Sequence, residues 1–104
     1  MNARFRLLNF ETRPVGGMKI PIGAVIERAG RVAVVRASRL PDVRSFDSQA
    51  VAHALDYNVA LLNSIRAFDE LPPAFSPQAH WDEPRETPAG VDDPVAWVTK
   101  YILP

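Results

Sequence analysis

The start of the chain alternates polar and apolar residues in the way that predicts a β-strand. Arg4-Phe5-Arg6-Leu7 alternates strictly, and the phase slips at Leu7-Leu8 before it resumes through Phe10. Because successive side chains of a strand point to opposite faces, such a slip indicates a β-bulge or a strand end. The sequence therefore predicts a first strand here with an irregularity near its middle.

A second strand is predicted from Lys19 to Glu27. Pro21 favours an edge position for this strand, because proline has no N–H to donate to a neighbouring strand. The alternate apolar residues are expected on one face of the strand: Ile20, Ile22, Ala24 and Ile26.

The segment Arg28-Ala29-Gly30 predicts a short hairpin connection in which Gly30 takes the positive φ that such turns need. A third strand follows from Arg31 to Ala37. Its apolar residues alternate between the two faces, so both faces of this strand are expected to be covered: Val32 and Val34 on one, Ala33 and Val35 on the other.

The one strong helix signal begins near Ser45 or Asp47, both favourable N-cap residues, and extends to about Phe68. Leu71-Pro72-Pro73 cannot continue a helix. A projection at about 100° per residue gives one apolar arc, which is the predicted core face. The arc contains Val51, Ala54, Leu55, Leu61, Leu62 and Ile65, with Tyr57 and Phe68 at its margin.

Asn58 falls near the middle of this arc, where its amide must be satisfied either within the fold or by a partner molecule. The opposite face of the helix has small or weakly charged residues and Arg66 as its one base. We expect the Pro-rich segment, the C-terminal helix or another chain to cover that face. Its other residues are Ala52, His53, Asp56, Ala60, Asn63 and Ala67.

Residues 71–93 are predicted to form a Pro-rich, acidic loop, and Asp93-Pro94 to open a short helix that extends through Ile102. The fold expected for residues 1–104 is a single α+β domain. It consists of a small antiparallel sheet of about three N-terminal strands, packed by one long central helix, the Pro-rich loop and the short C-terminal helix. Both helices are expected on one face of the sheet.

Composition narrows the function classes. The chain has 104 residues, no Cys, and 12 basic and 12 acidic side chains. Disulfide scaffolds, thiolate zinc sites and cysteine nucleophiles are therefore excluded. No apolar stretch approaches the length of a membrane-spanning helix, so we expect a cytoplasmic protein without a membrane partner.

The charges are balanced in total but not along the chain. Residues 1–44 contain nine basic and three acidic side chains, and the remainder contains three basic and nine acidic ones. Such asymmetry points to a charged partner, or to two halves that neutralise each other in the folded chain.

No motif for phosphate binding, nucleophilic catalysis or metal binding is present. The best catalytic cluster is His80-Trp81-Asp82-Glu83, which lacks a rigid frame and a second nearby histidine, unless His53 folds close to it. We therefore predict no catalytic residue, no metal site and no cofactor, and we do not expect an enzyme.

The stretch from Met18 to Ile65 resembles the HicB-type antitoxins, small proteins with a partial ribonuclease-H-like β-β-β-α unit that neutralise a toxin. The shared features are Met18-Lys19-Ile20-Pro21 opening a strand, the hairpin from Val25 to Val35, Leu40-Pro41-Asp42 before a polar turn, and the helix from Asp47. The departures from the pattern include a strand that precedes Met18 and the absence of the glycine usual after the Pro-Asp turn. The resemblance implies a bacterial or phage-like regulator that binds a protein.

The leading function hypothesis is a small non-enzymatic regulator or inhibitor, antitoxin-like or an accessory subunit, that occludes or assembles with a partner protein. A basic nucleic-acid enzyme or a toxin is the expected partner, and a homodimer is an alternative. Aromatic anchors and acidic residues that steer a basic partner are the predicted contacts. They are Phe75, Trp81, Asp82, Glu83, Glu86, Asp92, Asp93 and Trp97.

The alternative hypothesis is nucleic-acid binding by the arginine-rich N-terminal sheet, because arginine suits bidentate contact with phosphate. The net charge of zero and the calculated pI near 6.7 argue against a dedicated nucleic-acid-binding protein, because such proteins are usually basic. The candidate contacts are Arg28, Arg31, Arg36, Arg39 and Arg44.

Overall fold

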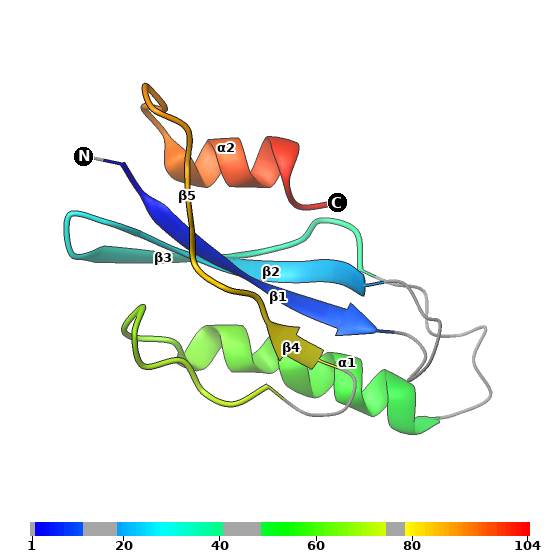
Figure 1. Cartoon of the computed structure of the whole chain (residues 1–104). Helices are drawn as coiled ribbons and strands as arrows, with labels where there is room; N and C mark the ends of the chain where they lie inside the picture. The colour runs from blue at the N-terminus through cyan, green and yellow to red at the C-terminus, as the bar shows by residue number, and fades with distance from the viewer. Residues whose placement is uncertain (1, 12–18, 41–48, 75–78) are drawn as a thin grey trace.

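A computed structural model describes residues 2–11, 19–40, 49–74 and 79–104 and arranges them as one sheet between two helices (Figure 1). The strands are β1 (Arg4–Glu11), β2 (Lys19–Arg28), β3 (Arg31–Arg36), β4 (Ala79–Trp81) and β5 (Arg85–Glu86), and the helices are α1 (Gln49–Leu61), the 3-10 turn η1 (Leu62–Ser64) and α2 (Pro94–Tyr101). The sheet order is β3-β2-β1-β4, with β5 also paired to β1, and every pair is antiparallel. The expected α+β class is confirmed, but the sheet has five strands rather than three.

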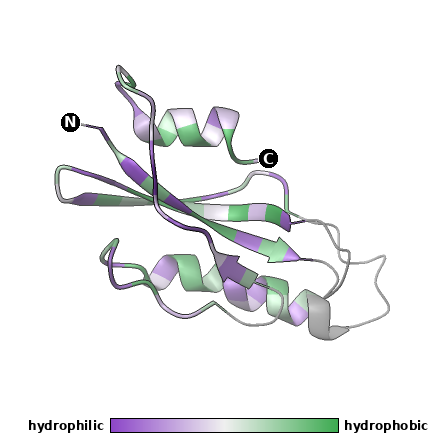
Figure 2. Cartoon of the chain, viewed as in Figure 1, coloured by the Kyte–Doolittle hydropathy of each residue, from purple (hydrophilic) through white to green (hydrophobic). Residues whose placement is uncertain are grey.

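The two helices lie on opposite faces of the sheet, so the expectation that both pack on one face is wrong (Figure 1). One buried cluster joins Leu8 and Phe10 to α1, and a second joins Phe5 and Leu7 to α2. Figure 2 shows apolar positions along the strands between the helices. A strand with apolar side chains on both faces needs cover on both sides, which is the physical reason for the three layers.

The Leu7-Leu8 doublet therefore reflects two buried faces of β1 rather than a phase slip. The irregularity lies one residue later and belongs to the partner strand: Leu8 pairs with Gly23 and Asn9 with Pro21, which leaves Ile22 as the extra residue of a bulge in β2. The bulge shifts the alternation of β2. Ile22 consequently packs with α1, whereas Ala24 and Ile26 pack with α2, so the common face predicted for these residues is wrong.

Pro21 does not mark an edge strand, because β2 lies between β1 and β3. Pairing with β3 extends from Arg28 to Gly23, and the Ala37 N–H donates to the Ile22 carbonyl at 2.9 Å. Pro21 lies just beyond the end of that ladder. Its missing N–H is therefore not needed there.

The β2–β3 hairpin turns through two residues with positive φ, Ala29 at 53° and Gly30 at 78°. This is the type I′ geometry that matches the twist of paired strands, and it confirms the conformation predicted for Gly30.

Helix α1 ends at Leu61, earlier than predicted, and is followed by η1; Ile65 is already extended. The Ser64 hydroxyl donates to the Leu61 carbonyl at 2.7 Å, a local hydrogen bond of the kind that competes with helix continuation. The predicted helix start and the Val51 side chain lie outside the described residues. The buried residues include most of the predicted arc, Ala54, Leu55, Leu62, Ile65 and Phe68, whereas Tyr57 is 54% exposed.

Asn58 is fully buried, and its Nδ2 donates to the Ala54 carbonyl at 2.7 Å. Within the fold the amide thus has the intrahelical partner that burial demands.

Part of the predicted Pro-rich loop runs along the second edge of β1 as two short strands. Ala79–Trp81 pairs with Phe10 to Leu8, and Arg85–Glu86 pairs with Phe5 and Arg4. The Asp82 N–H donates to the Leu7 carbonyl, and the Thr87 N–H donates to the Ala3 carbonyl, both at 2.9 Å. The segment therefore covers that edge of β1 from within the chain.

The beginning of α2 confirms its prediction. The Asp93 carboxylate accepts a hydrogen bond from the Ala96 N–H at 3.0 Å, and Pro94 follows it in the first turn.

Candidate functional site

The structure separates the two tryptophans that were predicted to anchor one partner. Trp81 is half-buried on the α1 side, where its indole N–H donates to the Pro72 carbonyl at 2.8 Å. Trp97 packs on the α2 side against Phe5, with ring centroids 6.0 Å apart. The two rings cover opposite faces of the sheet, and Phe75 lies outside the described residues.

The predicted acidic contacts are dispersed as well. Asp82 is half-buried beside β1, and its carbonyl accepts from Arg6 Nε at 2.8 Å. Asp93 uses its carboxylate to cap α2. Glu86 lies in β5 next to Arg4, and Glu83 and Asp92 are exposed elsewhere on the connection to α2.

Most residues of the predicted back of the central helix are exposed, whereas Ala52 and Ala67 are half-buried. His53, Asp56, Ala60, Asn63 and Arg66 are all exposed, and α2 lies on the other side of the sheet. Of the three covers considered for this face, the C-terminal helix is therefore wrong.

The segment His80-Trp81-Asp82-Glu83, the best catalytic candidate in the sequence although no catalytic residue was predicted, includes β4 and the residues that follow it. The His80 ring lies 3.7 Å from Glu11, across the β1–β4 pair, and is about half exposed. In the described part of the chain no group of three His, Asp or Glu side chains is placed to hold a metal ion. No described helix is both long and apolar enough to cross a membrane.

Strand β3 forms the other edge of the sheet, and no described strand lies beyond it. Arg28 and Arg31 flank the two-residue turn and form a hydrogen-bonded pair, as Ile22 and Ala37 do at the far end. Hydrogen-bonded and non-hydrogen-bonded pairs alternate along an antiparallel ladder. Between these two ends of the β2–β3 ladder, the N–H and C=O groups of Ala33 and Val35 therefore point to β2. The corresponding groups of Val32, Val34 and Arg36 then point away from the sheet.

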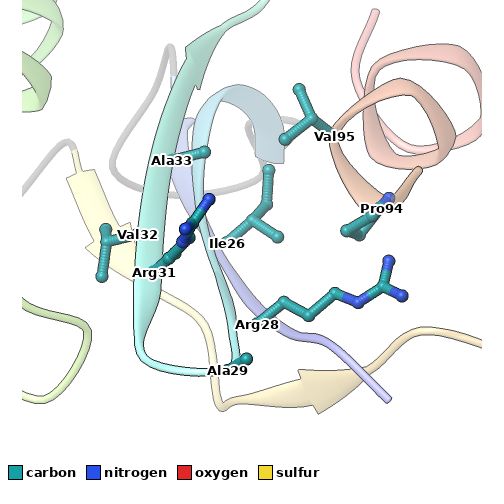
Figure 3. Close-up of a pocket in the computed structure, with 8 residues that line it drawn as sticks. All are labelled: Ile26, Arg28, Ala29, Arg31, Val32, Ala33, Pro94 and Val95. Atoms are coloured by element: carbon teal, nitrogen blue, oxygen red, sulfur yellow. The ribbon is translucent and has the colours of Figure 1, made fainter. Parts of the chain in front are cut away.

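A hollow of about 600 Å³ lies between the beginning of β3 and the beginning of α2 (Figure 3). Its apolar floor includes Ile26, Ala33 and Val95, and Arg28 and Arg31 stand at its rim. Figure 3 also shows Val32 on the opposite side of β3 from Ala33, as the alternation of a strand requires.

A second hollow, of about 500 Å³, lies on the other face at the far end of β3, against α1 and η1. Val34, Val59 and Leu62 contribute its apolar part, and Arg36 and Arg66 contribute two cations. The β3 edge is thus flanked by one hollow on each face, and each hollow has two arginines.

The predicted basic residues gather at this edge, with the exception of Arg44, which lies outside the described residues. Arg28 donates to the Asp92 carbonyl, and the Arg39 N–H donates to the Pro104 carbonyl. The side chains of Arg31 and Arg36 are exposed and make no hydrogen bond or ion pair with any described residue. The Arg39 guanidinium likewise makes no hydrogen bond or ion pair with a described residue, but Arg31 and Arg36 are the two cations that stand at the ends of β3 itself.

Arg4 shows the contrasting case. Its guanidinium hydrogen-bonds the Glu27 carboxylate and lies 4.4 Å from the centre of the Phe68 ring. The hydrogen bond to Glu27 raises the pKa of Arg4 above its ordinary value. This charge is already neutralised within the fold.

Two features of the edge were missed from the sequence. Arg66 was assigned to the back of the helix, but its side chain reaches the second hollow and donates to the Asn63 carbonyl at 3.0 Å. The outward groups of Val32, Val34 and Arg36 belong to the main chain. The available signal was the segment from Arg31 to Arg36 itself, which has no proline and no charge between its ends.

No protein-family model, curated protein or solved structure matches the chain.

Proposed function

We propose that this chain is a small non-enzymatic regulator that binds a partner protein by taking up an extended segment of it as an additional strand on β3. The observation that carries the proposal is the edge of β3, which no described strand covers and which has outward main-chain groups at Val32, Val34 and Arg36. Strand addition is a recurring mode of peptide recognition, in which main-chain hydrogen bonds supply affinity and side-chain pockets supply specificity. A domain of this kind acts by occluding its partner or by assembling with it.

The contrast between the two edges of the sheet supports this assignment. The edge at β4 and β5 consists of strands of three and two residues, interrupted by Pro84 and carrying the exposed Glu86. Short strands, proline and charge are the usual means by which proteins protect an edge from pairing. Strand β3 has six regular residues with a continuous apolar centre, so its edge is the one suited to accept a strand.

The hollows give the proposed interaction its specificity. Side chains of an added strand alternate between the two faces of the sheet. Those on one face would meet the hollow at Ala33 and Val95, and those on the other would meet the hollow at Val34 and Leu62.

Nucleic-acid binding is the second candidate, favoured by the exposed guanidinium groups of Arg31 and Arg36, which have no partner among the described residues. It uses the charges of the edge but not its outward main-chain groups. The two candidates therefore differ in what a main-chain change at β3 does to binding.

Selection of random displayed peptides on the chain, followed by titration of the selected peptide, tests the proposal. We expect Val34→Pro to weaken the peptide at least about tenfold, because it removes an outward N–H and obstructs pairing. Val59→Ala is the matched control, since it trims the same hollow without changing the strand. Peptide binding that Val34→Pro leaves unchanged would refute strand addition, and retained binding of labelled DNA or RNA by that variant would favour the second candidate.

A further inference from the structure

We infer that the segment taken up by β3 is acidic, with two carboxylate side chains five positions apart that pair with Arg31 and Arg36. This inference rests on the proposed strand addition and names the chemistry of its partner. The observation behind it is that β3, an edge strand of the described sheet, begins and ends with an arginine whose side chain has no partner among the described residues.

The charge of the edge is one-sided. Arg28 and Arg31 stand at the first hollow and Arg36 and Arg66 at the second, and no described acidic side chain lines either hollow. Arg28 and Arg66 donate to main-chain carbonyls, which leaves their positive charge without a carboxylate. A partner that brings negative charge would therefore complement both ends of the strand.

The register gives the spacing of the acidic residues. Cross-strand neighbours point to the same face of a sheet, and Arg31 and Arg36 point to opposite faces because an odd number of positions separates them. Two partner residues five positions apart also point to opposite faces, and they span about 17 Å. Four residues would lie between them, opposite the apolar centre of β3, and uncharged side chains that favour strands, such as valine and threonine, suit these positions.

The same charges disfavour a second copy of this chain as the occupant. Only residues with outward main-chain groups can exchange hydrogen bonds across a new ladder, so two-fold antiparallel pairing would pair Val32, Val34 and Arg36 with the same residues of the other copy, about an axis near the middle of β3. The seam would then gather two copies of Arg31 and of Arg36 with no carboxylate between them. An acidic segment from another protein removes that repulsion.

Titration of the chain with two synthetic peptides tests the inference. The first has the sequence Thr-Glu-Val-Thr-Val-Thr-Glu-Thr, and the second has lysine in place of both glutamates. We expect the glutamate peptide to bind about tenfold more tightly, and the double variant Arg31→Glu/Arg36→Glu to reverse the preference. The control variant Lys19→Glu/Lys100→Glu makes the same change in net charge away from β3, and should preserve the preference of the native chain.

The outcomes separate the inference from the proposal beneath it. Equal binding of both peptides by the native chain, with loss in Val34→Pro, would overturn the acidic partner and leave strand addition intact. Glutamate-peptide binding that survives Val34→Pro would overturn strand addition and the inference with it.

A dimer in solution whose β3 edge excludes both peptides would assign the edge to a second copy, and failure of both peptides to bind a monomer would refute the acidic motif. Displacement of the glutamate peptide by an oligonucleotide that Val34→Pro still binds would assign the arginines to nucleic acid.

Discussion

Replacement of Val35 by proline is expected to lower the free energy of unfolding by about 3 kcal/mol or more. The Val35 main chain pairs with Ala24 of the central strand β2; Ala24 is buried beneath α2, and the half-buried Val35 packs against the same cluster. Proline removes the N–H of this pair and leaves the Ala24 carbonyl buried without its partner. Chemical denaturation monitored by circular dichroism measures the loss.

Val34→Pro is the control for Val35→Pro, because it places proline one position away in the same strand. The two variants differ in whether the lost N–H points to β2 or away from the sheet. The N–H of Val34 points outward, so its removal leaves the β2–β3 ladder intact. The expected loss is about 1 kcal/mol, from the packing of a half-buried valine side chain. Equal destabilisation by the two variants would contradict the assignment of inward and outward groups on β3.

Gly23→Ala is expected to destabilise the fold by about 2 kcal/mol through overpacking. A Cβ atom at Gly23 would lie 2.5 Å from Leu62 Cδ1 and 3.0 Å from the Val35 carbonyl oxygen. Leu62 is buried in η1, so this contact is where the turn after α1 packs on the bulged region of β2. Thermal unfolding of the variant measures the cost.

A double-mutant cycle with Leu62→Ala identifies the source of this cost. Leu62→Ala alone should lose about 3 kcal/mol from the cavity it creates. In the double variant the new methyl group at residue 23 occupies part of that cavity, so the loss should be smaller than the sum of the single losses by about 1 kcal/mol. Strict additivity would mean that η1 does not pack on Gly23.

Local patterns were sufficient for much of the fold. Alternation located β1, β2 and β3, and the Asp93-Pro94 pair located the beginning of α2, because these signals depend on neighbouring residues. The bulge at Ile22 could not be read in the same way, since it depends on the register between two strands. It reversed the faces predicted for β2.

The candidate site depends on pairing between distant segments. Residues 79–87 pair with β1, from which most of them are more than seventy positions away in the sequence, and no described segment pairs with the outer side of β3. The sequence identified the basic group that contains Arg31 and Arg36 but could not place it at a strand edge. It also joined Trp81 and Trp97 in one surface, whereas the sheet lies between them.

Amide hydrogen exchange of the chain without a ligand tests the central claim, the free edge of β3, most directly. The N–H groups of Ala33, Val35 and Ala37 are directed to β2, and those of Val32, Val34 and Arg36 are directed outward. We predict slow exchange for the first set and fast exchange for the second, residue by residue along the strand. Slow exchange at all six positions in a monomer would contradict the account, because the edge would then be covered within the chain.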